Sequence, residues 1–400
     1  MKRRQFLKVV GSTTVIVAAT SYGAFLSSRT PIKALLPWKT AGNLYTDPMR
    51  RALSYAILAP NPHNRQPWLL DFKSDMEVLL YCDLTRLLAE TDPFSRQIMI
   101  GLGAFLELFS QAATQTGHRA ELSLFPEGVS GDKLDNRPIA RLILNKDVLI
   151  NEDPLFQFVL NRHTNRNAYD LSKLISNETL IKITKVKEVE ETGLSITAIG
   201  LKNIISSDST HLSNEKPSLE ILRQLTKNAL KDELLDPVAF QESIDLMRIG
   251  RSEIEASPDG ISLGGGFLES LKLLGLLSKK ELADPKSQSF QVGLDMADEQ
   301  TSTAMGFVWI NTLDNSRLDQ LAAGRSYMKL SLKVAEQGLQ MQPMSQALQE
   351  YSTMESHYQQ IHKLLTIKPH ERVQMLARLG YAEQSQPSPR WPLSTRIRGY

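Results

Sequence analysis

The sequence predicts an α+β fold, and three observations lead to that prediction. The 400 residues are 42% hydrophobic, which is enough to build the core of one large domain or of two ordinary ones. A long apolar helix is indicated from Asp92-Pro93 to Gly117, because residues typical of helix starts and ends bound it. Short apolar or alternating stretches predict strands, at residues 76–82, 120–125 and 139–144.

Composition argues against several classes of function. A net charge of +2 with 22% charged residues gives no basic excess, so no nucleic-acid partner is predicted. Cys82 is the only cysteine, which excludes an intrachain disulfide and a thiolate metal cluster. His357 and His362 are five positions apart, whereas a helical zinc pair needs four. No metal site is predicted.

Residues 1–28 are predicted to be a targeting segment. Lys2-Arg3-Arg4-Gln5-Phe6-Leu7-Lys8 precedes a moderately apolar run at residues 9–26, and the Arg-Arg-x-Phe-Leu-Lys order resembles a twin-arginine export signal. That resemblance implies a folded protein carried to the periplasm by the twin-arginine export machinery. The alternative is an ordinary membrane anchor, although glycine, serine and threonine interrupt the run. Because no clean cleavage site is visible, attachment to the inner membrane through residues 9–26 stays open.

A proline-rich loop follows the first predicted helix. Residues 29–46 are expected to be a linker, Asp47-Pro48 is expected to start the helix, and Trp68 to Phe72 reads as a strand. Between helix and strand, three prolines fix the backbone and remove donors, so residues 59–68 form a rigid loop. Such a loop can present its asparagines, histidine and arginine to a flat ligand. The alternative is a plain turn plugged by Trp68.

The chain contains an internal echo. Gly103 to Gly117 and Gly324 to Gly338 are apolar helical stretches of equal length that end on glycine, with Ser110 and Ser331 at equivalent places. They predict two related halves, residues 47–150 and 151–400. The second half is expected to hold strands at 194–199 and 305–312, helices at 219–235, 237–249 and 315–338, and a helical lid inserted at about 203–300.

The loop sequence Ala-Pro-Asn-Pro-His-Asn-Arg-Gln-Pro-Trp, residues 59–68, resembles the Ala-Pro-Ser-x-x-Asn-x-Gln-Pro-Trp signature of the nitroreductase family of FMN-dependent oxidoreductases. Asn61 and Pro62 replace the usual small residues, while five other positions match. The resemblance implies that this loop lies against FMN bound mainly by the opposite subunit. The residues that it assigns to FMN binding are Pro60, Asn61, Pro62, Asn64 and Gln66.

A second segment, residues 161–167, resembles the family's Arg-x-Ser/Thr-x-Arg motif. The resemblance implies that Arg162, Thr164 and Arg166 hold the phosphate and ribityl oxygens of FMN from the half opposite the proline loop. Two arginines that bracket a hydroxyl offer forked donors, which suit phosphate. The alternative is a solvated turn after a helix.

Two later stretches extend the resemblance. Gln342 to Ser345 falls where the family places backbone amides near the flavin N5, which assigns Met344 and Ser345 to the cofactor; the alternative is a proline that simply ends a helix. Arg378-Leu379-Gly380-Tyr381 and the later Pro389-Arg390 resemble the family's closing segments. They imply that Arg390 contacts the phosphate, while Trp391 stands where a second basic residue is common.

The resemblance is closest to the Acg-like branch of the family, single chains built from two nitroreductase-like halves. It implies a central, largely antiparallel sheet flanked by helices, a monomeric pseudo-dimer and one composite FMN site. The implied function is an FMN-dependent oxidoreductase that reduces a small electrophile such as a quinone or a nitro compound. The alternative is a protein that stores or sequesters FMN without turnover. No catalytic residue is assigned, since His63 is a candidate acid that can equally be structural.

Overall fold

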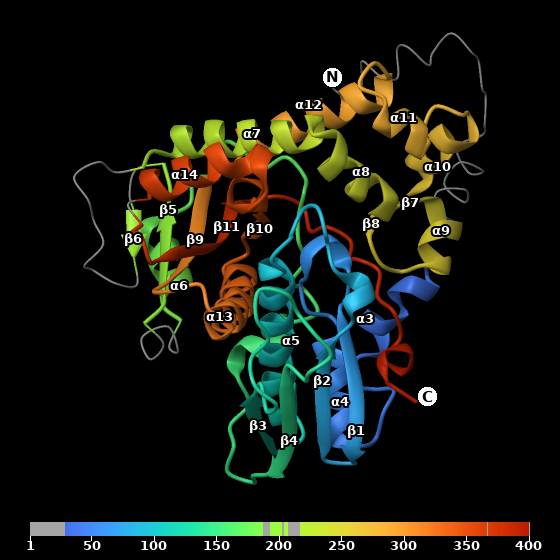
Figure 1. Cartoon of the computed structure of the whole chain (residues 1–400), viewed down its shortest axis with the longest axis vertical. Helices are drawn as coiled ribbons and strands as arrows, with labels where there is room; N and C mark the ends of the chain where they lie inside the picture. Colours follow the sequence, from blue (N-terminus) through green and yellow to red (C-terminus); the bar gives the residue numbers. More distant parts are fainter. Residues whose placement is uncertain (1–28, 187–192, 202–203, 207–216, 366, 400) are drawn as a thin grey trace.

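The computed structural model describes residues 29–186, 193–201, 204–206, 217–365 and 367–399 as a mixture of helices and antiparallel sheets (Figure 1). The predicted α+β class is confirmed. The predicted export signal at residues 1–28 lies outside the described residues. Among the helices that are described, none combines the length and apolar character needed to span a bilayer.

The first sheet has the strand order β1-β2-β4-β3 and is antiparallel throughout. Asp47 caps α4 by accepting from the Arg50 amide, with Pro48 at the first helical position as predicted. The long helix α5 starts at Arg96 instead of Asp92-Pro93, because Ser95 adopts a left-handed φ of 57°. The bounds are α4 (Pro48–Ala56), β1 (Trp68–Ser74), β2 (Glu77–Cys82), α5 (Arg96–Thr114), β3 (His118–Leu124) and β4 (Ala140–Lys146).

The second sheet repeats this topology with one added edge strand, in the order β10-β11-β9-β5-β6. In the first half, α5 connects β2 to β3 along the chain, and β4 lies between these two strands in the sheet. In the second half, α13 connects β9 to β10, and β11 lies between those two strands in the sheet. The described residues therefore form two main sheets, beside a small two-stranded parallel one in the insertion, where one central sheet was expected. The bounds are α6 (Asn177–Thr184), β5 (Ser195–Ile199), β6 (Ile204–Ser206), β9 (Gly306–Thr312), α13 (Arg317–Glu336), β10 (Gln340–Pro343), α14 (Glu355–Leu364) and β11 (Arg372–Gly380).

The two sheets meet through α5 and α13, which pack side by side (Figure 1). A Cβ on Gly103 would lie 2.2 Å from the Leu321 carbonyl oxygen, and a Cβ on Gly324 would lie 2.0 Å from that of Ile100. The contact is reciprocal, because Gly103 and Ile100 of α5 precede Gly324 and Leu321 of α13 by the same number of positions. Both helices are also followed by a glycine with positive φ, Gly117 at 69° and Gly338 at 67°.

An insertion of mainly short helices lies between β6 and β9, and we call residues 217–305 the lid. Figure 1 shows α7 lying across the top of the second sheet, with α8 and α9 descending toward α3. The helix expected at 237–249 ends at Leu246, where a short strand begins. The bounds are α7 (Leu219–Leu235), α8 (Pro237–Leu246), β7 (Met247–Ile249), α9 (Gly250–Ala256), β8 (Ile261–Leu263), α10 (Gly266–Leu273), α11 (Lys279–Ala283) and α12 (Gln288–Ser302).

The segment expected to be a linker packs onto the body. Residues 29–46 contain the 3₁₀ turn η1 (Lys33–Leu35) and the helix α3 (Leu36–Thr40). Trp38 is buried, and its indole Nε1 donates to the Ser388 carbonyl at 2.8 Å. This stretch thereby joins the start of the described chain to its C-terminal segment.

Candidate functional site

The proline loop, residues 59–68, connects α4 to β1 in a strained conformation. His63, Asn64 and Gln66 have φ values of 45°, 51° and 51°, in the left-handed region that non-glycine residues rarely adopt. The loop also lies against α5 at a glycine, because a Cβ on Gly101 would be 3.0 Å from the Asn61 Cβ. Strain of this kind persists only where surrounding contacts impose it, and it is frequent at functional sites.

The polar side chains of the loop bind protein groups. The Asn61 carbonyl oxygen Oδ1 accepts from the Gln66 amide at 2.7 Å, and Asn64 Nδ2 donates to the Pro389 carbonyl at 3.0 Å. Gln66 is fully buried; its Nε2 donates to the Pro258 carbonyl, and its Oε1 accepts from the Trp391 amide. In this structure the side chains of Asn64 and Gln66 brace the loop, and the assignment of both residues to cofactor binding stays a prediction.

Arg390 is the central brace of the loop. Its Nε donates to the Ile57 carbonyl, and its Nη2 donates to the carbonyls of Leu58 and Ala59, at 2.9 to 3.1 Å. Its Nη1 lies 2.6 Å from both Asn64 Oδ1 and Ser388 Oγ. The side chain is 2% exposed. These oxygens use the donors of its guanidinium group in this structure, and the assignment of Arg390 to phosphate stays a prediction.

The 161–167 segment runs beside β10. The Asn165 amide donates to the Met341 carbonyl at 3.0 Å, and Thr164 forms a parallel bridge with Met341. Arg378, which is fully buried, holds the end of the segment by donating to the Asn167 carbonyl at 2.8 Å. The segment is therefore an ordered extension of the second sheet, and the alternative of a solvated turn is not what the structure shows.

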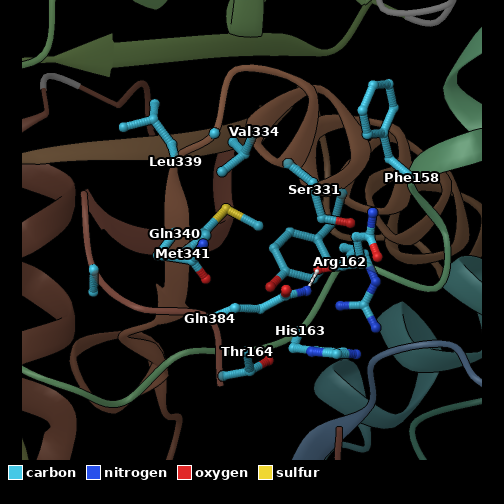
Figure 2. Close-up of a pocket in the computed structure, with 15 residues that line it drawn as sticks. Phe158, Arg162, His163, Thr164, Ser331, Val334, Leu339, Gln340, Met341 and Gln384 are labelled. Atoms are coloured by element: carbon cyan, nitrogen blue, oxygen red, sulfur yellow. Dashed lines mark hydrogen bonds between the residues drawn. The ribbon is translucent and has the colours of Figure 1, made fainter. Parts of the chain in front are cut away.

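Arg162 lies at the wall of a cavity of about 290 Å³. It is 6% exposed, its Nη2 makes one long contact of 3.4 Å with the Leu58 carbonyl, and its buried Nε has no partner among the described residues. A buried guanidinium with an unused donor beside a hollow is suited to an anion. Figure 2 shows Arg162, His163 and Thr164 near one side of the cavity and the apolar Val334 and Leu339 near the other.

Two titratable side chains beside Arg162, those of Tyr327 and His163, line this cavity. Burial raises the pKa of Tyr327, on α13, to about 12, against the opposing charges of Arg162 and Arg166. Burial, with the nearby Arg162 charge, lowers the pKa of His163 to about 4. The His163 Nδ1 donates to the Ser385 carbonyl at 2.8 Å, while its buried Nε2 has no described partner. At neutral pH the cavity thus presents a neutral phenol and a neutral imidazole beside a cationic guanidinium.

Arg166 and His63 bring the two predicted motifs together. Arg166 is exposed and makes no hydrogen bond or ion pair with any residue that the structure describes. Burial lowers the pKa of His63 to about 4, and the charges of Arg166 and Arg65 act in the same direction. His63 is therefore neutral at pH 7, with a buried Nδ1 that lacks a described partner. A charge on the second half thus acts on a histidine of the proline loop.

Met344 and Ser345 lie after β10, at the start of the 3₁₀ turn η6 (Ser345–Leu348). Met344 is 1% exposed, and its amide donates to the Leu376 carbonyl at 2.8 Å. The side chain and the amide of Met344 are thus both occupied in this structure, and its assignment to the cofactor stays a prediction. Ser345 is half-buried and stays a prediction. Pro60, Pro62 and Thr164 are also partly exposed, and Thr164 has no described partner for its hydroxyl.

The lid is fastened to the proline loop at Asp259. The Asp259 carboxylate lies 2.7 Å from Arg86 Nη1 and 3.0 Å from Arg248 Nη2, with Arg65 Nη1 at 3.8 Å. Burial opposes ionisation, but a Ser257 hydrogen bond and these arginine charges lower the pKa of Asp259. The Gly260 amide also donates to the Asn64 carbonyl. We call this set of contacts the Asp259 latch.

Comparison with known proteins gives a partial match. A stretch of 81 residues, 20% of this chain, is 37% identical to the provisionally named NAD(P)H nitroreductase acg of Mycobacterium tuberculosis. A 125-residue stretch is 29% identical to an uncharacterised protein of the same organism. The matched stretches span 24% and 36% of those relatives, and no family profile matches the chain.

Solved structures show only a distant likeness. The FMN- and NADPH-dependent nitroreductase NfnB of a Sphingopyxis strain is 12% identical with a TM-score of 0.34, over 61% of this chain and 97% of that one. Iodotyrosine deiodinase bound to FMN and 3-iodo-L-tyrosine is 14% identical with a TM-score of 0.31, over 60% and 94%. Likeness at these scores does not by itself establish a shared fold.

Proposed function

We propose that the protein is an FMN-dependent oxidoreductase of nitroreductase type that acts on a small electrophile. The observation that carries the proposal is the convergence of two motifs from opposite halves: the strained loop at residues 59–68 and the ordered Arg-x-Thr-x-Arg segment at 162–166. Family-like sequence order, rather than likeness of the whole fold, is the support. The 37% identity over 81 residues to a named nitroreductase adds to it.

The residues present fit the anionic end of FMN. Arg162 has an unused buried donor, Arg166 has no described partner, and Thr164 stands between them in the sequence. These three side chains would hold the phosphate, and Arg390 would act only by keeping the loop in place. Bound FMN would supply two-electron redox chemistry. The protein would supply forked donors, a rigid loop and a lid that excludes water.

The phosphate assignment is tested by removing both guanidinium groups. The double variant Arg162→Met with Arg166→Met should fold normally but lose most of its flavin, because each charge-assisted hydrogen bond contributes on the order of 1.5 to 3 kcal/mol. A control with Arg119→Met and Arg137→Met removes two exposed arginines of the first half and should keep its flavin. Full flavin occupancy in the Arg162 and Arg166 variant would remove phosphate binding from these residues.

Turnover is tested separately. Anaerobic mixing of the flavin-loaded protein with NADH, NADPH or a quinol should bleach the flavin absorbance, and subsequent addition of a quinone or nitroaromatic compound should restore it. A flavin that stays oxidised with all three donors would contradict the oxidoreductase proposal.

The Asp259 latch favours a second candidate function, storage of FMN beneath a closed lid. The latch places one buried carboxylate of the lid among three arginines: Arg65 of the proline loop, Arg86 of the turn after β2, and Arg248 of the lid itself. Asp259→Asn should loosen this connection and accelerate flavin release several-fold. If the protein stores FMN, flavin release should limit the exchange of the cofactor, and no electron donor should bleach the flavin absorbance. If it is an enzyme, a donor should bleach the flavin absorbance while the latch is intact.

Export by the twin-arginine route is also part of the proposal. FMN is made in the cytoplasm, and the proposed site exists only in the folded chain, so a route for folded proteins would carry the loaded holoprotein. Replacing Arg3 and Arg4 with lysine should retain flavin-loaded protein in the cytoplasm of fractionated cells. Normal levels on the periplasmic side would require withdrawal of this localisation.

A further inference from the structure

Three arginines at and near the cavity carry positive charge without an acidic partner. Arg162 and Arg390 are both buried, and Arg166 follows Arg162 by four positions. None of the three forms an ion pair with a carboxylate of the described residues, and the charge of Arg162 helps burial to lower the pKa of Arg390 to about 9. A buried cation is normally paired, because taking its charge out of water without compensation is costly. These charges therefore favour an anion beside them.

Tyr327 adds an unused donor to the cavity wall. Its side chain is 3% exposed and lines the cavity, and its hydroxyl has no hydrogen-bond partner in the part of the chain that the structure describes. Leu106 occupies the equivalent place on α5, since each residue lies three positions after the glycine of the helix contact. A leucine is buried there at no cost, whereas a buried hydroxyl loses free energy unless it is hydrogen-bonded. The phenol thus indicates a ligand that accepts a hydrogen bond.

The next turn of α13 offers an acceptor to the same cavity. Ser331 follows Tyr327 by four positions, so both side chains lie on one face of the helix. Ser331 is buried and lines the cavity (Figure 2), and its Oγ donates its only hydrogen to the Met328 carbonyl at 2.7 Å. The Oγ can therefore only accept a hydrogen from a ligand. His163 is similar, because its Nδ1 donates to Ser385 and its Nε2 carries no hydrogen in the neutral ring.

We propose that this cavity binds inorganic phosphate when flavin is absent, with Arg162 and Tyr327 donating to its oxygens and Ser331 accepting its hydrogen. Phosphate keeps an O–H group at pH 7, whereas sulfate has none, so the acceptors distinguish these two oxyanions. A cavity of about 290 Å³ has room for either ion. Such binding requires neither FMN nor turnover, and it makes free phosphate a competitor for the donors that the proposed function gives to the cofactor.

Isothermal titration calorimetry of the flavin-free full chain tests the phosphate site. Inorganic phosphate should bind once per chain, and sulfate at equal ionic strength should bind at least tenfold more weakly. Tyr327→Phe should weaken phosphate binding about tenfold, because one charge-assisted hydrogen bond is lost. Ser331→Ala should remove most of the preference for phosphate over sulfate. Tyr81→Phe on β2 and Ser110→Ala, at the equivalent turn of α5, are matched controls and should bind as the parent does.

Phosphate affinity that Tyr327→Phe leaves unchanged would overturn the proposal, and so would sulfate that binds as tightly as phosphate. A competition arm separates free phosphate from the phosphate end of FMN. If the cavity takes both, saturating phosphate should raise the apparent Kd of FMN but not that of riboflavin, which lacks the phosphate. If phosphate binds through Tyr327 without affecting FMN, the phosphate site stands and the assignment of Arg162 to FMN fails. A chain that binds FMN but no inorganic phosphate would overturn the phosphate site and leave the proposed function intact.

Discussion

Arg390 illustrates how one residue type serves two different needs. A guanidinium group suits a phosphate, and for the same geometric reason it suits a cluster of carbonyl oxygens at a helix end. Here the carbonyls of Ile57, Leu58 and Ala59 follow α4 and take those donors. The sequence motif located the arginine correctly beside the loop, but motif position alone does not say which oxygens are its partners.

Arg390→Lys should therefore destabilise the fold even in protein without flavin. Lysine keeps the charge but cannot reach the same set of oxygens, and the buried carbonyls left unpaired should lower the free energy of unfolding by about 3 kcal/mol. The urea midpoint of flavin-free protein measures this. Arg119→Lys, at an exposed ion pair, should change the free energy of unfolding by no more than about 0.5 kcal/mol. Equal midpoints for both variants would contradict the bracing role.

Glu233 is a buried carboxyl that the sequence did not reveal. It lies in the last turn of α7, is 5% exposed, and its Oε2 has no described partner. Burial raises the pKa of Glu233 to about 7, with the charges of Glu242 and Asp236 acting in the same direction. The folded state therefore binds the proton more tightly than the unfolded state does. Its contribution to stability is present below about pH 4.5 and is lost as the pH rises through 7.

Glu233→Gln should remove this loss. At pH 8 the variant should be more stable than the parent by on the order of 2 kcal/mol, whereas at pH 4.5 the two should be nearly equal. Urea midpoints across this range measure the difference. A remaining slope is expected from Asp92, since burial raises the pKa of its carboxyl to about 7 as well. Parallel curves for parent and variant would show that Glu233 titrates normally.

At the scale of elements, the echo of two helices was the most informative sequence feature. It located α5 and α13 and the glycines that follow them, whereas the repeated strand order around them came only from the structure. The close approach of the helices could not be foreseen, because an interior glycine in a helix is equally compatible with an open surface. Gly103 and Gly293 are both interior helical glycines, yet a Cβ on Gly293 would meet nothing within 4 Å.

That pair provides a matched test of the helix contact. Gly103→Ala should destabilise the protein by about 2 to 3 kcal/mol, because its Cβ would collide with the Leu321 carbonyl. Gly293→Ala should stabilise it by about 0.5 to 1 kcal/mol through the helix propensity of alanine. Thermal or urea unfolding of both variants measures the difference. If Gly103→Ala is as stable as Gly293→Ala, the two helices do not pack this closely.

At the scale of the whole molecule, local signals predicted the class and most elements. Local sequence signals could not predict the contacts of the lid, because Asp259 is far in the sequence from its partners Arg65 and Arg86. Tyr327, which lines the cavity, belongs to no motif, whereas Arg378, which holds the end of the 161–167 segment, lies in a stretch that the resemblance did single out. The protein partners of the loop side chains, near residues 258 and 390, were not predicted for the same reason, since they are remote in the sequence.

The composite site predicts one FMN per chain. The proline loop occurs only in the first half and the Arg-x-Thr-x-Arg segment only in the second, so the two halves supply different portions of one site. Flavin released by denaturation and counted against protein concentration should give a ratio near one. A ratio of two would contradict the composite site and would require a second set of phosphate donors.

Because α5 and α13 belong to one chain, equivalent positions on the two helices can carry different residues. Glu107 on α5 binds Arg325 and Lys329 of α13, at 3.0 and 3.2 Å. The positions equivalent to these three residues under the same offset are Met328, Ala104 and Leu108, all buried in one apolar cluster. In an interface between identical subunits, every substitution would appear twice. In a single chain, the contact at Glu107 can be an ion pair while the equivalent contact at Met328 is apolar. Dilution cannot separate the two halves, because they are covalently joined.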